Sequence, residues 1–353
     1  MIFIKLLGFD GYRYMTFFII GSGAIGITLG ARLSSSGFPC AMVGHNRYIK
    51  RVMDGKIPVI FDGDFHHVSI EFIKSVDDLE VNNGDVLIIA VKTYSISSLL
   101  QQLLTNVNRN SPILCLQNGI DSDLHFARYF PNTMGAVVHL SCTLQPNMVV
   151  RQTINNGIGI GCISCSTKEI ASFLCETLET SGIPSWIENN LMAQKRTKLL
   201  INATGAIMAL HNVSIEEAFL DDYIHAKIRS IAFESAAILA NLYRDENDML
   251  GLKNLYETLE RIQSGDLIQI SQEEFCNRKI QGLLSYPSIW QDLEYQRGQT
   301  EIDSLNGKIL ELAKLFGKPA PINEQVVALI KKAQSKYLKP SELVCNKNFS
   351  LSM

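Results

Sequence analysis

The chain has 353 residues, with 32 Lys and Arg against 35 Asp and Glu and a formal net charge of −3. This near-balance argues against a general nucleic-acid binder, which needs a basic face, and no apolar run reaches the roughly 18 residues that span a bilayer. The length suggests two domains at about 150 residues each. Eight cysteines without a recognisable secretion signal favour a reducing compartment, so we expect a cytoplasmic protein.

The first half of the chain alternates short β-rich segments with helical stretches. Met15 directly precedes the first apolar run and competes with Met1 as the start, which would make residues 1–14 an N-terminal extension. The predicted elements are strand Thr16–Ile20, helix Ala24–Ser36, strand Pro39–Val43, a hairpin of Val59–Phe61 and Val68–Phe72, strand Asp85–Val91, helix Ser95–Leu104, strands Pro112–Leu116, Met134–Leu140, Val149–Gln152 and Gly157–Gly161, helix Lys168–Ser181 and strand Pro184–Glu188. This rhythm predicts a doubly wound, Rossmann-type α/β domain over residues 15–188.

Strand-like alternation disappears after about residue 189, and long helical periods replace it. The predicted helices are 191–209, 214–242, 250–263, 298–316 and 322–337. We therefore expect an all-helical domain over residues 189–338. The tail 339–353 has no periodicity and is predicted to be disordered.

A glycine-rich turn follows the first predicted strand and opens the first helix. Its residues are Gly21, Ser22, Gly23, Ala24, Ile25 and Gly26. In the G-x-G-x-x-G pattern the first glycine permits a tight turn, the second lets a pyrophosphate approach the backbone, and the third lets helix and strand pack closely. A glycine-rich turn without a ligand is the plainer interpretation, but the strand–turn–helix setting favours a dinucleotide site.

The end of the second strand indicates which dinucleotide would bind. An NAD site wants an acidic residue there for the ribose 2′-hydroxyl, but the sequence continues as Gly44, His45, Asn46 and Arg47, with no acid until Asp54. The guanidinium of Arg47 suits a 2′-phosphate, which favours NADPH. The alternative is a solvated basic helix start.

Further polar residues lie where ligands of such domains bind. Lys92 and Asn118 end two buried strands at their carboxyl ends, where open α/β sheets bind ligands. Lys198 and Asn202 are four residues apart on a predicted helix and share one face; alone, such a pair is more often plain helix surface. Cys162 and Cys165 lack the second pair that a zinc site needs, so no metal is expected.

The ordered set of motifs resembles the ketopantoate reductase (2-dehydropantoate 2-reductase) family over residues 16–336. The segments that carry the resemblance are IIGSGAIGITLGARL at 19–33, DVLIIAVKTY at 85–94, LQNGI at 116–120, KLLINA at 198–203 and SIWQDLEYQRGQTEIDSLNGKI at 288–309. The resemblance implies NADPH-dependent reduction of ketopantoate to pantoate, in pantothenate and coenzyme A biosynthesis. It also implies an active site in the cleft between an N-terminal Rossmann domain and a helical C-terminal domain.

The resemblance also implies roles for individual residues. Lys198 would be the catalytic general acid, and Glu301 would orient it or the substrate hydroxyl. Asn202, Ser288 and Asn118 would bind the substrate. Lys92 and Asn118 would also contact the cofactor and border the reaction centre. The partner is then a small 2-oxo acid, and the sequence leaves a homodimer open.

Some positions depart from the family pattern. His45 stands where an arginine for the 2′-phosphate is usual, Ala206 where many members have a second substrate-binding asparagine, and Ser285 where some have another asparagine. These changes leave two alternatives to ketopantoate reduction. The chain would reduce a different 2-oxo acid on the same fold, or it would be a non-catalytic NADP-binding regulator.

Overall fold

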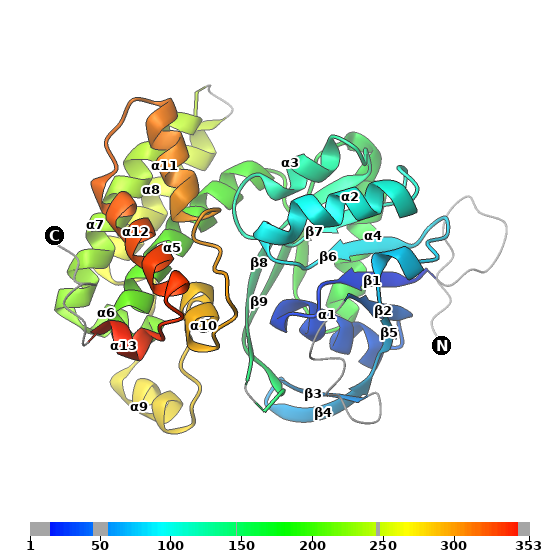
Figure 1. Cartoon of the computed structure of the whole chain (residues 1–353), viewed down its shortest axis with the longest axis horizontal. Helices are drawn as coiled ribbons and strands as arrows, with labels where there is room; N and C mark the ends of the chain where they lie inside the picture. The colour runs from blue at the N-terminus through cyan, green and yellow to red at the C-terminus, as the bar shows by residue number, and fades with distance from the viewer. Residues whose placement is uncertain (1–14, 45–55, 146, 245–247, 345–353) are drawn as a thin grey trace. The chain divides into compact units, whose positions relative to one another are not determined.

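The computed structural model describes residues 15–44, 56–145, 147–244 and 248–344. They form two compact units: an N-terminal unit of the described residues up to Gln117 together with those from Asp121 to Leu191, and a C-terminal unit of Asn118–Ile120 together with the described residues from Met192 onward. The N-terminal unit is a sheet with helices and the C-terminal unit is helical (Figure 1), so the predicted fold class is confirmed.

The N-terminal unit is built on a mixed, largely parallel sheet. Its path runs β4-β3-β9-β8-β7-β6-β1-β2-β5, and β10 pairs with β9. The strands are β1 (Phe17–Ile20), β2 (Cys40–Val43), β3 (Lys56–Phe61), β4 (Asp64–Ser69), β5 (Glu71–Ile73), β6 (Val86–Ile89), β7 (Ile113–Cys115), β8 (Thr133–Leu144), β9 (Val150–Cys162) and β10 (Ser185–Ile187). Strand β1 is parallel to both β6 and β2, with Ile20 in register with Ile89 and Val43. Only β8–β9 and the β3–β4 hairpin pair antiparallel within this sheet of described residues.

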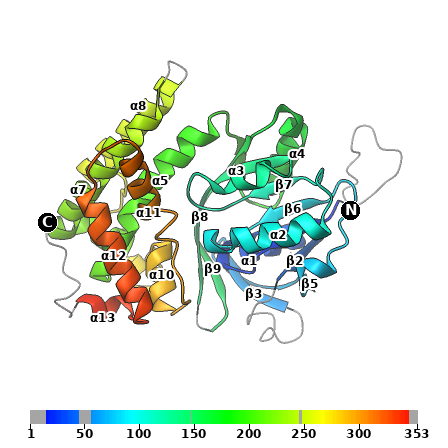
Figure 2. The ribbon, with the colours of Figure 1, turned by 45° about the horizontal axis from the view of Figure 1, so that its top comes forward.

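Helices cover both faces of this sheet. Phe17 and Ile19 of β1 pack in one core with α1 (Ala24–Ser35) and α4 (Lys168–Thr180). Their neighbours Phe18 and Ile20 pack in a second core with α2 (Ile96–Asn106) and α3 (Ser122–Ala127). Figure 1 shows α2 and α3 above strands β6 and β1 and α1 below them, and Figure 2 shows the same unit turned by 45°. Burial on both faces explains why β1 and β6 are uninterrupted apolar runs.

The C-terminal unit surrounds a central helix, α5 (Leu191–His211), whose residues from Ala203 to Leu210 are all buried. Around it are α6 (Ile215–Leu220), α7 (Asp222–Leu239), α8 (Met249–Ser264), α9 (Gln272–Ile280), α10 (Ser288–Glu294), α11 (Asn306–Leu315), α12 (Pro321–Ser335) and α13 (Pro340–Val344). Helix α7 packs against α8, α11 and α12.

Three expectations for this half are wrong in detail. The helix predicted over 214–242 is broken at Asp221, whose extended backbone and side chain cap α7 by accepting hydrogen bonds from the N–H groups of Tyr223 and Ile224. The helix predicted over 298–316 begins only at Asn306. In the tail 339–353, predicted to be disordered, Pro340–Val344 form α13 with Pro340 and Leu343 buried, while residues 345–353 lie outside the described residues.

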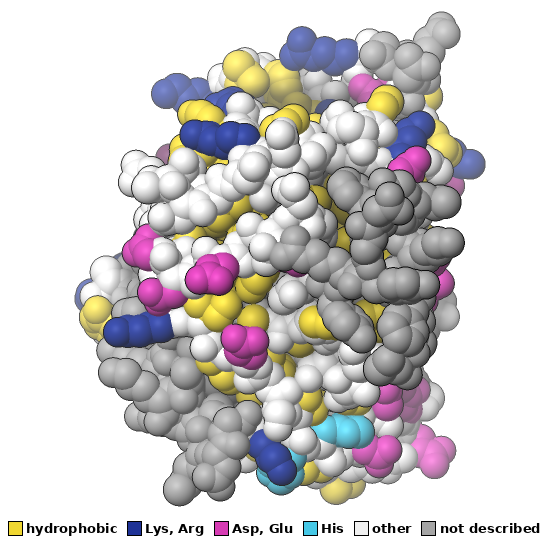
Figure 3. Space-filling view, turned by 90° about the vertical axis from the view of Figure 1, so that its right-hand side faces the viewer, with side chains coloured by type: hydrophobic (Ala, Val, Ile, Leu, Met, Phe, Trp, Pro, Cys, Tyr) yellow, Lys and Arg dark blue, Asp and Glu magenta, His cyan; other side chains and the backbone are white. Residues whose placement is uncertain are grey.

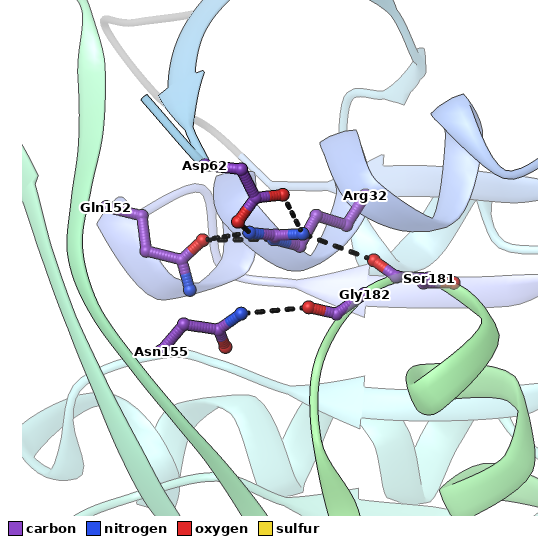
Figure 4. Close-up of polar contacts among 6 residues, drawn as sticks. All are labelled: Arg32, Asp62, Gln152, Asn155, Ser181 and Gly182. Atoms are coloured by element: carbon purple, nitrogen blue, oxygen red, sulfur yellow. Dashed lines mark hydrogen bonds and ion pairs between the residues drawn. The ribbon is translucent and has the colours of Figure 1, made fainter. Parts of the chain in front are cut away.

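A buried arginine joins four parts of the N-terminal unit (Figure 4). Arg32 near the end of α1 is 2% exposed, and its guanidinium donates to both carboxylate oxygens of Asp62, at 3.0 and 2.6 Å. It also donates to Gln152 Oε1 at 3.0 and 2.7 Å and to the carbonyl oxygen of Ser181 at 3.4 Å. The hairpin turn, β9 and the end of α4 are thereby fixed to α1.

The surface carries charges of both signs. Figure 3 shows acidic and basic side chains interspersed over one face, with no continuous basic patch among the coloured atoms. Within the described ranges, no helix combines the length and the apolar character needed to cross a membrane.

Candidate functional site

The glycine turn after β1 is tight at its first and last glycines. Gly21 has φ +117°, and a Cβ atom there would lie 2.6 Å from the backbone of Ala90 and Val91. A Cβ atom on Gly26 would collide with the carbonyl oxygen of Gly21. Because side chains are excluded at both positions, the turn lies directly against the end of β6 and against the first turn of α1.

Gly23 is different, because it faces open space. A Cβ atom there would meet no atom within 4 Å, and Gly23 is exposed. It is the N-cap of α1, no side chain caps that helix, and the first turn holds no acidic residue. The first N–H groups of α1 and the positive end of its dipole are therefore available to an anion.

The turn also lies where the strand order reverses. After β1 the chain passes to β2 on one side, whereas β6 lies on the other. Ligands of open α/β sheets bind at such a switch point, beyond the carboxyl ends of the strands. The structure thus brings the six predicted residues Gly21, Ser22, Gly23, Ala24, Ile25 and Gly26 to a position that fits a dinucleotide pyrophosphate.

Lys92 lies at the same edge of the sheet. It follows β6 as the N-cap of a short 3₁₀ turn, Thr93–Ser95, two residues after the Ala90 backbone that Gly21 contacts. Buried Gln117, which directly precedes the predicted contact residue Asn118, donates from Nε2 to the carbonyl oxygens of Ile89 (2.7 Å) and Val91 (3.2 Å). It thereby holds the ends of β6 and β7 together, and a polar residue directly after a buried strand was the signal for it.

The predicted 2′-phosphate ligand has no position in the structure. Strand β2 ends at Val43, and Gly44, with φ +133°, donates its N–H to the carbonyl oxygen of Ile73. Arg47 and His45 lie outside the described residues. The choice between NADPH and NADH therefore remains a prediction from the sequence.

In the C-terminal unit, four of the predicted residues come together around α5. Lys198 and Asn202 lie on one face of that helix, and Asn202 Nδ2 donates to Asn118 Oδ1 at 3.5 Å. Asn118 is followed by Gly119, whose φ is +88°. A Cβ atom added at Gly119 would lie 3.1 Å from the carbonyl oxygen of Ser304. Asn118–Ile120 therefore belong to the C-terminal unit, with Asn118 beside α5.

Glu301 completes this group from the segment before α11. Glu301 is 3% exposed, and the preceding Thr300 is fixed by its N–H and hydroxyl, which donate to Gln334 Oε1 at 2.9 and 3.0 Å. Burial and the nearby ammonium of Lys195 lower the pKa of Lys198 to about 8, while the carboxylate of Glu301 opposes this shift. A lysine with such a pKa exchanges its proton near neutral pH.

Ser288 is the first residue of α10 and is half-buried. The preceding Pro287 packs against α5 at Gly205, where a Cβ atom would lie 2.9 Å from the proline Cβ. Gly205 is three residues beyond Asn202, so the two lie on neighbouring turns of one helix face. The start of α10 is therefore adjacent to the Lys198–Asn202 face.

Two positions in this half depart from the family pattern, and neither presents a polar group to the Lys198–Asn202 face of α5. Ala206 is completely buried in the core of the C-terminal unit. Ser285 is buried and is bonded to Glu216 and Arg278. Among the residues that the structure places, no group of three or more His, Cys, Asp or Glu side chains is arranged to hold a metal ion.

Comparison with known proteins identifies matches over most of the chain. A family profile described as ketopantoate reductase PanE/ApbA matches residues 17–164, and the profile of its C-terminal region matches residues 190–334. A 2-dehydropantoate 2-reductase of Pyrococcus horikoshii is 26% identical, covering 91% of this chain and 98% of that protein. The corresponding protein of Aquifex aeolicus is 24% identical, covering 90% and 96%.

Solved structures share the fold. D-mandelate dehydrogenase in a ternary complex with NADH and anilino(oxo)acetate aligns with a TM-score of 0.77 at 20% identity, covering 92% of this chain and 99% of that one. A PanE/ApbA family ketopantoate reductase from Ralstonia eutropha aligns with a TM-score of 0.71 at 20% identity and the same coverage. A ketopantoate reductase from Staphylococcus aureus, described as dimeric, has a TM-score of 0.67 at 19% identity, covering 92% and 100%.

Proposed function

The chain belongs to the ketopantoate reductase family, and we propose that it is an NADPH-dependent reductase of a 2-oxo acid, with ketopantoate the first candidate. The observation that carries the proposal is the group Lys198, Asn202, Asn118 and Glu301. In it, a lysine with a pKa of about 8 shares a helix face with an asparagine that is hydrogen-bonded to a second asparagine.

The N-terminal unit would hold the cofactor. The open position above Gly23 and the uncapped start of α1 fit the pyrophosphate, and Lys92 would contribute a positive charge at the same edge. Bound NADPH supplies a hydride, which the C2 carbonyl carbon of the substrate accepts. We assign the 2′-phosphate to Arg47 on its sequence position alone.

The C-terminal unit would supply the proton. As the C2 carbon is reduced, its oxygen becomes an alkoxide, and the Lys198 ammonium stabilises that charge before donating a proton from Nζ. Glu301 keeps a negative charge near the ammonium, which favours its charged form. Asn202 and Asn118 would hold the substrate oxygens, and Ser288 would add a hydroxyl contact.

The test is steady-state oxidation of NADPH with a panel of 2-oxo acids that includes ketopantoate. Lys198→Ala should lower kcat by about 10²–10⁴, the usual range for a positioned proton donor, with little change in NADPH affinity. Asn202→Ala should mainly raise KM, because it removes a contact made in ground and transition state alike. Wild-type kcat in Lys198→Ala would contradict the assignment of the general acid.

Cofactor choice needs its own experiment. Titration of the protein's effect on nicotinamide fluorescence should show tighter binding of NADPH than of NADH, and Arg47→Ala should remove the difference without changing NADH affinity. Equal affinities in the wild type would refute the NADPH assignment. We also propose a homodimer, as described for the Staphylococcus aureus protein, which sedimentation equilibrium would test.

One alternative has a specific observation in its favour. Ala206 stands four residues after Asn202, where many members of the family have a second substrate-binding asparagine. A pocket with one asparagine fewer would suit a 2-oxo acid with a less polar substituent than ketopantoate, such as the aryl group implied by the name of D-mandelate dehydrogenase. A higher kcat/KM for phenylglyoxylate than for ketopantoate would decide for this alternative.

A further inference from the structure

The start of α10, which carries Ser288, is held by polar contacts. The preceding helix α9 has no buried residue, and the segment 281–287 between the two helices has no regular secondary structure. Ser285 in that segment is nevertheless 3% exposed. Ile289 and Leu293 anchor α10 itself in the apolar core, whereas Ser285 is a buried polar residue that needs polar partners.

Four hydrogen bonds fix the backbone and side chain of Ser285. Its N–H donates to both carboxylate oxygens of Glu216, at 3.0 and 3.3 Å. Its carbonyl oxygen accepts from the N–H of Ile215 at 2.8 Å, and its hydroxyl oxygen accepts from Arg278 Nη2 at 3.3 Å. The peptide groups on both sides of Ser285 are thus bonded to the start of α6.

Arg278 closes the network from α9. Its Nη2 atom forms an ion pair with Glu216 Oε1 at 3.0 Å and donates to the carbonyl oxygen of Leu283 at 3.1 Å. The Glu216 side chain is 4% exposed, and a carboxylate so deeply buried is tolerated only when it is paired and hydrogen-bonded. Because all these groups depend on one another, the network has one low-energy arrangement.

The position of Ser285 is transmitted to Ser288 over a short, stiff segment. Tyr286 stacks on Trp290 of α10, with ring centroids 3.9 Å apart. Pro287 has a restricted φ and packs against Gly205 of α5. A shift at Ser285 would therefore move the first turn of α10 relative to the face of α5 that carries Asn202.

We propose that Glu216 and Arg278 are positioning residues for Ser288 and, through it, for the 2-oxo acid. The proposal rests on the proposed function, because it takes Ser288 as a substrate contact. Neither residue is assigned a contact with the substrate or the cofactor. Their effect should appear in KM for the oxo acid.

The neighbouring ion pair provides a matched control. Lys279 Nζ is 2.8 Å from Glu217 Oε1, so this pair joins the same two helices one residue further along. The Lys279 side chain is 56% exposed, and exposed pairs contribute little to stability. Lys279→Met removes an ion pair between α6 and α9 but leaves the bonds to Ser285 intact.

The experiment compares Arg278→Met, Lys279→Met, Ser288→Ala and the Arg278→Met/Ser288→Ala double variant in the full chain. Arg278→Met should raise KM for the best 2-oxo acid by about three- to tenfold, the worth of one neutral hydrogen bond. Its kcat should stay within about twofold and its NADPH dissociation constant should not change. Ser288→Ala should raise KM by a similar factor, and the double variant should show no further rise, because both changes remove one contact. Lys279→Met should match the wild type.

Amide hydrogen exchange provides a readout that does not need the substrate. The N–H of Ser285 should exchange faster in Arg278→Met than in the wild type and Lys279→Met. Arg278→Lys should have an intermediate KM, because an ammonium can pair with Glu216 but lacks the planar fork of Arg. If Arg278→Met does not fold, Arg278→Lys and Ser285→Ala take its place. Ser285→Ala removes only the hydroxyl acceptor of the network. An unchanged KM for the oxo acid in both variants would overturn the proposal.

Other outcomes are equally decisive. If the Ser285 N–H exchanges faster in Arg278→Met while KM is unchanged, the network only stabilises the fold, and the positioning role is overturned. A rise in KM in Lys279→Met equal to that in Arg278→Met would also overturn it. An unchanged KM in Ser288→Ala would show that Ser288 does not contact the 2-oxo acid, and it would therefore also overturn the positioning role. A wild type that reduces none of the 2-oxo acids would refute the proposed function itself, whereas failure of the positioning role leaves wild-type turnover in place.

Discussion

Two glycines in the turn after β1 should respond in opposite ways to the same substitution. Gly26→Ala places a methyl group against the carbonyl oxygen of Gly21, a backbone atom in a turn that itself lies on Ala90. Neither backbone segment can move without disturbing the packing of β1 against β6. Overpacking of this kind costs about 1–3 kcal/mol, and we expect a value of about 3 kcal/mol because the obstacle is backbone.

Gly23→Ala should leave the fold nearly unchanged. No atom lies within 4 Å of the added methyl group, and the backbone of Gly23, with φ −79° and ψ 179°, suits alanine. Alanine at an N-cap costs no more than about 1 kcal/mol relative to glycine. The methyl group would instead fill the space assigned to the pyrophosphate. Loss of one charge-assisted hydrogen bond is worth about 1.5–3 kcal/mol, so NADPH affinity should fall by roughly 10- to 100-fold.

Thermal unfolding and fluorescence titration distinguish the two effects. A loss of about 3 kcal/mol lowers Tm by roughly 6–12 °C in a unit of this size, so Gly26→Ala should show that shift in the absence of cofactor. Gly23→Ala should have a near-wild-type Tm but weak NADPH binding, and added NADPH should raise its Tm less than that of the wild type. Wild-type NADPH affinity in folded Gly23→Ala would refute this turn as the phosphate site.

Two further predictions concern the buried arginine and the pH dependence. Arg32→Met should lower the free energy of unfolding in urea by about 3 kcal/mol, since it removes several charge-assisted hydrogen bonds. Asp62→Asn should cost only about 1 kcal/mol, because the Asp62 side chain is 60% exposed and the Gln152 and Ser181 acceptors remain; an equal cost would show that the ion pair dominates. The logarithm of kcat/KM for reduction should fall with a slope near −1 above about pH 8, because Lys198, whose pKa is about 8, must carry the proton that it donates. A profile that stays flat to pH 10, or a fall that persists in Lys198→Ala, would contradict that assignment.

The sequence predicts a local feature well where a single physical requirement decides which residue type can stand there. Strands β1 and β6 are apolar throughout because both faces are covered, and their predicted positions agree with the structure to within two residues. The glycine turn is predictable because only glycine tolerates the backbone of Gly21 and the contact at Gly26. Helix periodicity predicts that Lys198 and Asn202 share one face, whereas their proposed roles come from the resemblance to the family.

Other features depend on partners that are distant in the sequence. The helical periodicity of 214–242 continues through Asp221, so only the capping bonds of that residue reveal the break. The start of α11 is set by Asn306, whose side chain donates to Ala203 and Asn323. The bond between Asn118 and Asn202 joins residues 84 positions apart. No local pattern contains such information.

Asn118 lies in a short segment of the chain that leads from the sheet, which is proposed to bind the cofactor, to the helical unit, which is proposed to supply the proton. By sequence it ends a strand of the sheet, where a cofactor contact is the natural expectation, yet Asn118–Ile120 belongs to the C-terminal unit. Ile120 is buried in the core of that unit, and the positive φ of Gly119 turns the chain towards it. Because β7 ends at Cys115, only Leu116 and Gln117 separate the sheet from a residue that bonds to α5. The buried amide of Gln117 is bonded to the end of β6, so this residue belongs to the sheet, whereas Ile120, three residues later, packs among the helices of the C-terminal unit.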